Sequence, residues 1–553
     1  MKERIETAVR ETVAAWLAGR GISAPEMPPL TVPREKQHGD FATTAALAVS
    51  KAAGMAAKDV ARELATALDD RLQGVATCDV AGPGFINFKL SCTADRAVFA
   101  SLLAQGDLIG YSKAHAGTRV NVEYVSANPT GPLTVGHGRN AAIGDVIANL
   151  LAATGHEVTR EYYFNDAGNQ MTTLARSVRT RYRQVLGLDE QLGENDYQGE
   201  YIIEIARKVQ LDHGDTLRDS TDLGVFKSYA VEAMFALIMA TLDRMRVKHD
   251  VYYNEHSLYR EGKIEETLRL IAKKDLSYEK DGAVWLKTTA LGADKDRVLV
   301  KTTGEPTYRL PDIAYHMTKY ARQFDRIVNI FGADHNDEFV DVVSCLKALG
   351  YDTTRITVLI YQFVTLVRNG EAVKMSTRKA TYVTLDDLMD EVGVDATRFF
   401  FVMRRLGSHC EFDLELAKKQ SLDNPVFYVQ YAHARICSMF RHAAETKPVF
   451  GEDTFDAGTA DAALLAEPEE RELVNWLARF ADTVARSAET CEPHRLTDYL
   501  VKLAELLHSY YNKHQVVVEN EAVAAARLAL MLVTMRVVRN GLAILGVEAP
   551  ERM

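Results

Sequence analysis

Apolar positions along residues 117–166 follow a strand pattern, then a helical pattern, then a strand pattern again. The run RVNVEYV predicts a strand, the segment from Gly138 onward predicts a helix, and HEVTREYYFND predicts a second strand. The apolar residues of the predicted helix share one face, at positions Ile143, Val146, Ile147, Leu150 and Leu151. We therefore expect a β–α–β unit whose helix packs against a parallel sheet.

Later segments repeat this alternation and then become helical. DRIVNIFGADHNDEFVDVVSCLKALG predicts a strand, turn and helix, and RITVLIYQFVTLV predicts a strand pair. Residues from about 170 to 300 are mixed and charged, which favours an insertion within the α/β domain over an extension of its sheet. Beyond about residue 420 the pattern is helical, with AAARLALMLVTMRVVRNGLAIL long enough to close a bundle. One predicted helix face there comprises Leu496, Tyr499, Leu500, Leu503, Leu506, Leu507 and Tyr510.

The N-terminal part has a different pattern and predicts a separate domain. Residues 1 to about 110 carry two helical patterns and a strand-like ending, VAGPGFINFKLS, followed by the loop-like GYSKAHAGT. At 553 residues the chain also exceeds what one hydrophobic core usually serves. We predict three domains, over residues 1–110, 116–405 with the insertion at about 170–300, and 420–553.

Composition narrows the class of protein only slightly. The chain is 47% hydrophobic and 25% charged, which is ordinary for a globular protein. A net charge of −11 argues against a nucleic-acid partner, but 65 Lys and Arg residues suffice for a local basic stripe.

Cysteine spacing and the N-terminal segment bear on where the protein works. The six cysteines, at positions 78, 92, 345, 410, 437 and 491, form neither a zinc ribbon nor a Cys-x-x-Cys pair. Glu3, Glu6 and Glu11 interrupt the first segment, which argues against a signal peptide or presequence. No window approaches 18 uninterrupted apolar residues. We therefore expect reduced cysteines, no membrane segment and a cytoplasmic location.

The bend SANPTGPLTVGHG, residues 126–138, joins the first predicted strand to its helix. Ligands of open parallel sheets bind beyond the carboxyl ends of the strands, where helix N-termini present unpaired N–H groups. Gly136 and Gly138 flank His137 there, so backbone can approach an anion and an imidazole can donate a hydrogen bond to it. This arrangement suits a triphosphate, although a turn with a surface histidine gives the same pattern. It is not a Walker loop, because no Gly-Lys-Ser/Thr follows.

A second stretch, VKMSTRKATYVTLDDL at residues 373–388, is rich in cations. Its three cations, Lys374, Arg378 and Lys379, flank Ser376 and Thr377 in the sequence. Such a loop could close on a phosphate chain and stabilise charge that develops in a transition state. The alternative is a solvated basic loop.

Together the two stretches resemble a known family. TVGH and KMSTR resemble the HIGH and KMSKS signatures of class I aminoacyl-tRNA synthetases. The surrounding sequence resembles the arginyl-tRNA synthetase family over almost the whole chain, in HGDFATTAALAVSKAAG, AGPGFINFKL, VEYVSANPTGPLTVGHGRNAAIGD, PTYRLPDIAYH, GADH, KMSTRKATYVTLDDLMDEVGVDATRFFF, NPVFYVQYAHARI and RNGLAILGVEAPERM.

The resemblance implies both a fold and a reaction. The fold would be multidomain α/β, with a class I nucleotide-binding, Rossmann-like catalytic domain on a parallel sheet, an insertion, an α+β N-terminal tRNA-contacting domain and an all-α anticodon-binding bundle. The activity would be that of a monomeric ligase that joins L-arginine to AMP from ATP and passes it to the terminal adenosine of tRNA(Arg). Mg²⁺ would accompany ATP rather than occupy a protein cage. Adenylate formation would require bound tRNA.

The same resemblance assigns an arginine pocket. A guanidinium cannot be deprotonated, so its site needs fixed carboxylates and planar acceptors. The matching positions are Glu123, Ser126, Asn128, Tyr308 and Asp312. If Tyr308 begins a helical turn, Asp312 returns to the same face. The alternative for that pair is a helix N-terminal acid beside a buried tyrosine.

The nucleotide and catalytic positions also come from the resemblance. ATP would meet residues matching the family's nucleotide site, namely Thr134, Gly136, His137, Gly138, Asp334, His335 and Met375. Catalytic roles would fall to His137, Lys374, Ser376, Arg378 and Lys379.

Two positions depart from the family pattern. Thr134 replaces the first histidine of HIGH, and Thr377 replaces the second lysine of KMSKS. Some arginyl enzymes carry a lysine upstream of HIGH instead, but residues 128–137 contain none. Arg378 or Lys379 is the nearest replacement, with Arg139 a further candidate.

In the C-terminal part, Tyr428, Tyr431 and Arg435 on one predicted helix offer stacking and phosphate contacts to tRNA. The alternative is that these aromatics are core residues.

Two rival functions also stay open: a non-catalytic tRNA-binding paralogue, favoured by the missing lysine, and a class I enzyme for another amino acid such as cysteine. The scattered cysteines argue against the thiolate zinc site that a cysteine enzyme would hold.

Overall fold

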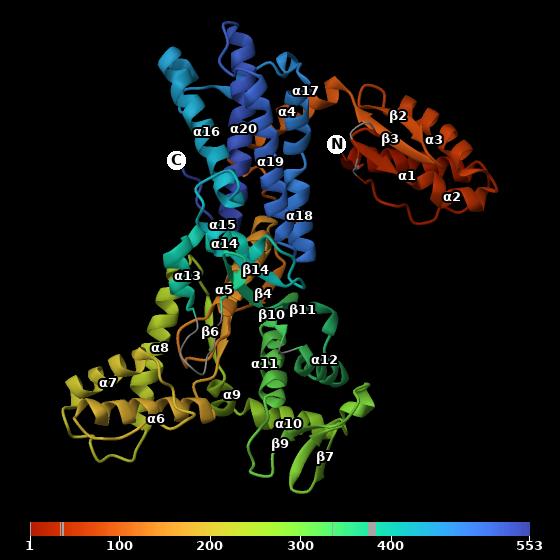
Figure 1. The fold of residues 1–553 in the computed structure, drawn as a ribbon. Helices are drawn as coiled ribbons and strands as arrows, with labels where there is room; N and C mark the ends of the chain where they lie inside the picture. Colours follow the sequence, from red (N-terminus) through yellow and green to blue (C-terminus); the bar gives the residue numbers. More distant parts are fainter. Residues whose placement is uncertain (1, 32, 34, 36–37, 334–335, 374–382) are drawn as a thin grey trace. The chain divides into compact units, whose positions relative to one another are not determined.

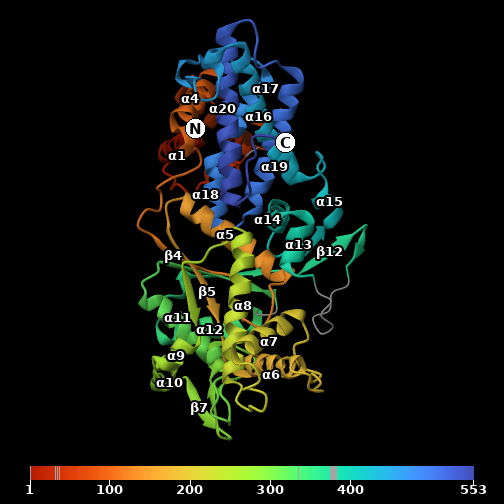
Figure 2. The same cartoon turned by 90° about the vertical axis from the view of Figure 1, so that its left-hand side faces the viewer.

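The computed structural model describes residues 2–31, 33, 35, 38–333, 336–373 and 383–553 (Figures 1 and 2). The chain forms two compact units. One unit comprises Met1–Ile109, Ile436–Phe480 and Glu505–Val537, and the other comprises Gly110–Arg435, Ala481–Ala504 and Val538–Met553. The second unit holds the candidate site.

The second unit is built on a five-stranded parallel sheet. Its order is β11-β10-β4-β5-β6, with bounds β4 (Arg119–Glu123), β5 (Glu157–Phe164), β6 (Val251–Asn254), β10 (Arg326–Gly332) and β11 (Ile356–Tyr361). The chain runs outward from β4 through β5 to β6, then returns to build β10 and β11 on the other side of β4. The strand order therefore reverses between β4 and β10, which is where such sheets open a ligand crevice.

The predicted β–α–β unit is confirmed as β4, α5 (Val135–Ala153) and β5. The five apolar positions predicted for one helix face are all fully buried, and α5 packs against β4, β5 and β10. The helix begins three residues before the predicted Gly138, at the residue that follows Thr134. Gly144 allows the close approach to the sheet, because an added Cβ would lie 2.2 Å from Cγ of Tyr124.

The segment of about 170–300, predicted to be an insertion, holds mainly helices and a small antiparallel sheet, but it also contributes one strand to the parallel sheet. It contains the helices α6 (Gly168–Val185), α7 (Glu200–His213), α8 (Gly224–Arg244), α9 (His256–Arg260) and α10 (Lys263–Lys273), and an antiparallel sheet of β7 (Ser277–Lys280), β8 (Ala283–Leu286) and β9 (Arg297–Val300). However, β6 also lies in this segment and extends the parallel sheet. Its four residues, VYYN, are too few to show a period in the sequence.

The predicted strand pair at 355–367 is also corrected. Two strands are present, but β11 belongs to the parallel sheet, whereas β12 (Val364–Arg368) pairs with β13 (Glu371–Ala372) and β14 (Cys410–Asp413). The other helices that lie wholly in this unit before α16 are α11 (Arg309–Ala321), α12 (Asn336–Leu349), α13 (Leu385–Val392), α14 (Val394–Val402) and α15 (Leu414–Lys418).

The first unit begins with a three-stranded antiparallel sheet of order β1-β3-β2, covered by helices. The strands are β1 (Phe41–Thr43), β2 (Ala76–Ala81) and β3 (Phe85–Leu90), and the helices are α1 (Lys2–Ala18), α2 (Ala45–Ala53) and α3 (Ala57–Arg71). Their apolar side chains form one buried cluster. Because α4 (Cys92–Gln105) follows, residues 1–110 hold four helices rather than the two that were predicted.

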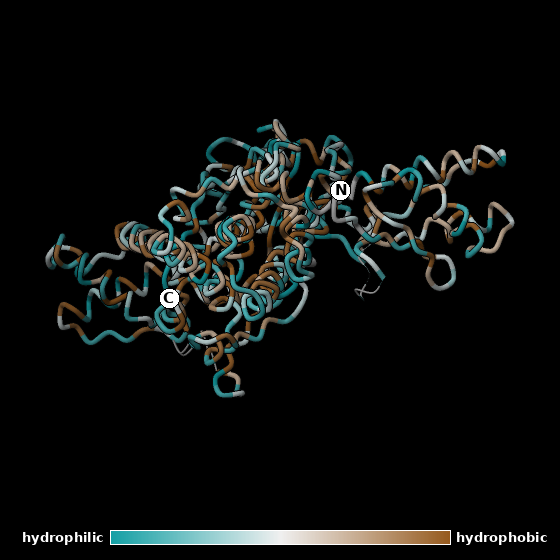
Figure 3. Tube along the Cα trace, turned by 90° about the horizontal axis from the view of Figure 1, so that it is seen from above, coloured by the Kyte–Doolittle hydropathy of each residue, from teal (hydrophilic) through white to brown (hydrophobic). Residues whose placement is uncertain are grey.

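The helical pattern predicted beyond residue 420 is confirmed. The long helices are α16 (Pro425–Thr446), α17 (Pro468–Leu477), α18 (Phe480–Thr490), α19 (His494–Lys513) and α20 (Glu521–Leu545), and α16, α19 and α20 each contribute residues to both units. All seven residues of the predicted α19 face are buried. Figure 3 shows hydrophobic stretches along the helices and many hydrophilic ones in the projecting loops.

Two described helices, α8 and α20, meet the length and hydropathy requirement for crossing a membrane. The apolar window of α20 is 83% buried within the protein, and that of α8 is 33% buried. A core helix meets the same requirement, and the burial of α20 is that of a core helix.

Candidate active site

A cavity of about 510 Å³ opens at the carboxyl ends of the parallel strands. Four strands of the sheet contribute to its lining, and the residue directly after the fifth strand, β6, does so too. These residues are Glu123 from β4, Tyr163 from β5, Glu255 after β6, Gly332 from β10 and Tyr361 from β11. The cavity therefore spans the point where the strand order reverses. All five residues predicted for the arginine pocket line it, together with His137: Glu123, Ser126, Asn128, Tyr308 and Asp312.

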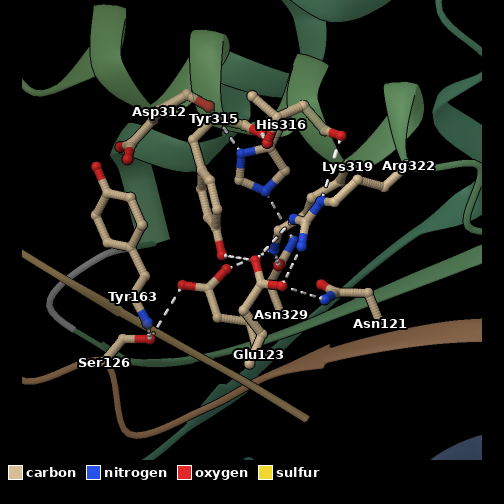
Figure 4. Close-up of polar contacts among 12 residues, drawn as sticks. Asn121, Glu123, Ser126, Tyr163, Asp312, Tyr315, His316, Lys319, Arg322 and Asn329 are labelled. Carbon is tan, nitrogen blue, oxygen red and sulfur yellow. Dashed lines mark hydrogen bonds and ion pairs between the residues drawn. The ribbon is translucent and has the colours of Figure 1, made fainter. Parts of the chain in front are cut away.

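The bend after β4 adopts an unusual backbone conformation. Val125 and Ser126 have φ values of 68° and 44°, in the left-handed region that non-glycine residues rarely occupy. Asn140 holds this bend, because its Oδ1 accepts the N–H of Val125 at 3.0 Å. The Ser126 hydroxyl accepts the N–H of Tyr163 at 3.1 Å and donates to Oε1 of Glu123 at 3.1 Å (Figure 4). The strained bend thereby fixes a hydroxyl and a carboxylate on one wall of the cavity.

Glu123 is buried and paired on its other oxygen. Its Oε2 lies 2.6 Å from Nζ of Lys319, a fully buried residue of α11. Asn128 lies nearby on the same wall, where its Oδ1 accepts the N–H of Asn165 at 3.0 Å and its Nδ2 donates to Gln170 at 3.3 Å.

Tyr308 and Asp312 form the other wall. Tyr308 directly precedes α11 and has helical φ and ψ, and its carbonyl accepts the N–H of Asp312 at 3.2 Å. The two residues therefore lie on one helical turn, as predicted. The side chain of Tyr308 is 71% exposed, which excludes the alternative of a buried tyrosine.

Glu255 is a cavity residue that the sequence reasoning missed. It is buried, and it accepts hydrogen bonds of 2.8 Å from the Tyr163 hydroxyl and from Nδ2 of Asn165. Burial raises the pKa of Glu255, although these two hydrogen bonds oppose the shift. Its position after β6 matches that of Glu123 at the end of β4, but the short strand before it was not recognised.

His137 lies in the first turn of α5 with one ring nitrogen already occupied. Its Nδ1 accepts the N–H of Thr134 at 3.1 Å, so in the neutral imidazole the proton lies on Nε2. Among the described residues, a Cβ on Gly136 would meet only the Thr134 hydroxyl, at 3.7 Å, whereas one on Gly138 would lie 2.5 Å from the Leu385 side chain. Gly136 therefore leaves the helix N-terminus open, and Gly138 serves packing.

The C-terminal part of the cation-rich stretch, at Thr384 and Leu385, lies beside this turn. Thr384 and Thr134 form an isolated β-bridge, and the N–H of Leu385 donates to the carbonyl of Leu133 at 2.8 Å. Seven predicted positions lie outside the described residues: Asp334, His335, Lys374, Met375, Ser376, Arg378 and Lys379.

Four further predicted positions do not line the cavity, namely Arg139, Tyr428, Tyr431 and Arg435. Arg139 is fully buried and donates to the carbonyls of Gln362, Arg405 and Ser408, so its guanidinium is poorly placed to meet a nucleotide. Tyr428, Tyr431 and Arg435 follow one another at helical spacing on α16 and are half-buried.

Three family models match the chain in sequence order. They are the arginyl tRNA synthetase N terminal domain at residues 1–90, the catalytic domain of "tRNA synthetases class I (R)" at residues 98–401, and the DALR anticodon binding domain at residues 429–553.

Relatives match over nearly the whole length. The chain is 47% identical to an arginine–tRNA ligase of Salinibacter ruber, covering 95% of each chain, and 47% identical to one of Desulfotalea psychrophila, covering 94% of each. A crystal structure of a putative arginyl-tRNA synthetase from Campylobacter jejuni superposes with a TM-score of 0.77 at 29% identity, over 84% of this chain and 100% of that one. The chain belongs to the arginyl-tRNA synthetase family of class I aminoacyl-tRNA synthetases.

Proposed function

We propose that this chain is an arginine–tRNA ligase. It joins the carboxylate of L-arginine to the α-phosphorus of ATP, releases diphosphate, and passes the arginyl group to the 3′-terminal adenosine of tRNA(Arg). The proposal rests on one observation: carboxylates on two walls of the same cavity lie beside the N-terminus of α5. Fixed carboxylates suit a substrate with two cationic ends, and a helix N-terminus suits its phosphorylated partner.

In this proposal the two walls take different ends of arginine. Asp312 and Tyr308, with Glu255 across the cavity, receive the guanidinium. Glu123, Ser126 and Asn128 receive the α-amino end. Both sets line the same cavity, which supports the assignment.

ATP is proposed to lie with its phosphates at the start of α5. Nε2–H of His137 donates to a phosphate oxygen, and Thr134, Gly136 and Gly138 shape the turn, while Asp334, His335 and Met375 lie beside the adenosine. Mg²⁺ enters with the phosphates.

Lys374 and Ser376 of the cation-rich stretch bind the phosphate chain in this proposal. Because Thr377 is uncharged, we propose that Arg378 or Lys379 stabilises the negative charge that moves onto the departing diphosphate. Alanine substitution of the responsible residue should slow adenylate formation by about a hundredfold and leave ATP affinity within a few fold.

The tRNA is proposed to meet three parts of the chain, namely residues 1–110, the catalytic residues 116–405 and the helical residues 420–553. Tyr428, Tyr431 and Arg435 supply stacking and phosphate contacts on α16. Their partial burial leaves ring surface for such contacts. We propose further that the chain acts as a monomer in the cytoplasm, without a membrane.

The direct test is tRNA charging with each of the twenty radiolabelled amino acids. We expect arginine alone to be attached, and only when ATP is present. Charging with cysteine or another amino acid instead would assign a different class I activity, and no charging at all would favour the non-catalytic paralogue. Omission of ATP from the arginine reaction is the matched control.

A further inference from the structure

A lysine is buried directly behind the cavity. Lys319 of α11 has no exposed surface, and its Nζ lies 2.6 Å from Oε2 of Glu123 and 2.8 Å from Oδ1 of Asn329 (Figure 4). The ammonium also lies 4.5 Å from the centre of the Tyr315 ring. A buried charge is costly unless it is paired and hydrogen-bonded, and Lys319 has a carboxylate, an amide oxygen and a ring face as partners.

Lys319 belongs to a chain of hydrogen bonds that joins the two walls. The Asp312 carbonyl accepts from Nδ1 of His316 at 2.8 Å, and Nε2 of His316 accepts from Nδ2 of Asn329 at 3.1 Å. Oδ1 of Asn329 then accepts from Lys319, which donates to Glu123. Burial lowers the pKa of His316 to about 3, so its imidazole is neutral and can both donate and accept. The chain fixes the orientation of every member.

The two oxygens of Glu123 therefore have different tasks. Oε2 is held by Lys319, whereas Oε1 accepts the Ser126 hydroxyl at 3.1 Å, on the wall that lines the cavity. A carboxylate paired with a buried ammonium is held in place, but it attracts a second cation less strongly than an unpaired carboxylate would.

We propose that Lys319 is a positioning residue that sets the direction in which arginine lies. It holds Glu123 to accept the α-ammonium group through Oε1 and leaves the guanidinium to the wall of Asp312. This inference rests on the proposed function and adds to it a residue that does not touch the substrate.

The chain offers a matched control one turn further along. Arg322 also pairs with a fully buried carboxylate of the sheet, with its Nη2 2.8 Å from Oε1 of Glu161. Burial alone would raise the pKa of Glu161, but the hydrogen bond from Arg322, the charges of Lys319 and Arg322 and the hydrogen bond from Tyr315 together lower it. Unlike Glu123, Glu161 does not line the cavity. Removing Arg322 therefore takes from a buried carboxylate the cation that hydrogen-bonds to it, as removing Lys319 does, but at a carboxylate outside the cavity lining.

The test compares Lys319→Met, the double variant Lys319→Met/Glu123→Gln, and Arg322→Met in the full chain with tRNA. The measurements are the melting temperature and the kcat/KM for arginine and for ATP. We expect Lys319→Met to lower kcat/KM for arginine by about ten- to a hundredfold, with that for ATP within about threefold.

The other two variants separate positioning from stability. The double variant should regain melting temperature but not the arginine kcat/KM. Arg322→Met should lose melting temperature while keeping kcat/KM for arginine within about threefold.

If the double variant has the kcat/KM for arginine of the unsubstituted protein, the proposal is wrong. This comparison can be made even if Lys319→Met alone does not fold. An equal arginine deficit in Arg322→Met would overturn it too. If the unsubstituted protein does not charge arginine, the proposed function fails together with this inference. If the unsubstituted protein charges arginine and Lys319→Met has the same kcat/KM for arginine, only this inference fails.

Discussion

Three carboxylates reach the cavity by three different routes along the chain. Glu123 ends β4, Glu255 follows β6, and Asp312 lies in the first turn of α11. Each is placed by backbone that is fixed before any ligand binds, through strand pairing or helix geometry. Preorganised acceptors of this kind recognise a planar cation without reorganising when it arrives.

Asp312→Asn keeps the shape of the side chain and removes its charge. We expect the KM for arginine to rise by about thirtyfold or more, because the variant removes one partner of a desolvated charge pair. The KM for ATP should stay within about threefold. Steady-state charging at varied arginine and ATP measures both. The control is Asp196→Asn, which removes a buried carboxylate paired with Arg176 away from the cavity. An unchanged KM for arginine would remove Asp312 from the pocket.

Glu255 gives a pH signature. Since burial raises its pKa, its carboxyl takes up a proton at a higher pH than an ordinary glutamate and loses its attraction for a guanidinium there. We expect kcat/KM for arginine to fall as pH is lowered through that raised pKa, because this parameter reports the free enzyme. Glu255→Gln should have a lower kcat/KM at neutral pH and a flatter profile. Profiles of equal slope in the two proteins would exclude Glu255 as the titrating group.

Among individual residues, the sequence predicted some members of each cavity wall and missed others. Glu123, Ser126, Asn128, Tyr308 and Asp312 stand in motifs long enough to carry a resemblance, and all five line the cavity. Glu255 and Lys319 stand in no motif with a recognisable chemistry. Their placement depends on β6 joining β5 and on α11 lying against β4 and β10, which are contacts between distant parts of the chain.

Among the elements, α5 shows how a helix can serve both core and site. Its middle packs against the sheet on three strands, and its first turn carries His137 at the cavity. Two glycines of this helix differ in the space around them. A Cβ on Gly144 would lie 2.2 Å from the Tyr124 ring, whereas a Cβ on Gly136 would meet no atom of the described residues closer than 3.7 Å.

Gly144→Ala should therefore destabilise the protein by about 1–3 kcal/mol through overpacking, despite the better helix propensity of alanine. Gly136→Ala, the matched control, should change the free energy of unfolding by less than about 1 kcal/mol. Denaturant unfolding of the two variants measures both values. Equal stability of the two would show that α5 does not approach the sheet as closely as Tyr124 requires.

Elements with a clear period were predicted well, and elements defined by their neighbours were not. The α5 and α19 faces follow from apolar spacing within one helix, and both are buried. The four residues of β6 have no readable period, and nothing in RITVLIYQFVTLV says that its two strands join different sheets. Strand partners are chosen by long-range pairing, which a local pattern does not encode.

In the whole molecule, the cavity is lined by residues between positions 123 and 361. The residues proposed to contact tRNA include the α16 stripe, which consists of Tyr428, Tyr431 and Arg435. The α16 stripe lies outside the cavity lining, so any effect on amino-acid activation of tRNA bound at that stripe must be transmitted through the protein. Binding energy from a remote part of a substrate can be used in this way to complete a catalytic site.

We accordingly expect exchange of labelled diphosphate into ATP to be absent with arginine alone and to appear when tRNA(Arg) is added. A tRNA for another amino acid is the control and should give little exchange. Full exchange without tRNA would show that the cavity is complete in the free protein, and would contradict the proposed coupling.

The central claim is that the cavity beyond the parallel sheet binds arginine with its guanidinium at the Asp312 wall and its α-ammonium at the Glu123 wall. A crystal structure with arginine and a non-hydrolysable ATP analogue measures this directly. We predict guanidinium nitrogens within hydrogen-bonding distance of the Asp312 carboxylate and the α-ammonium within that distance of Oε1 of Glu123. Arginine bound in the reverse direction, or outside this cavity, would contradict it.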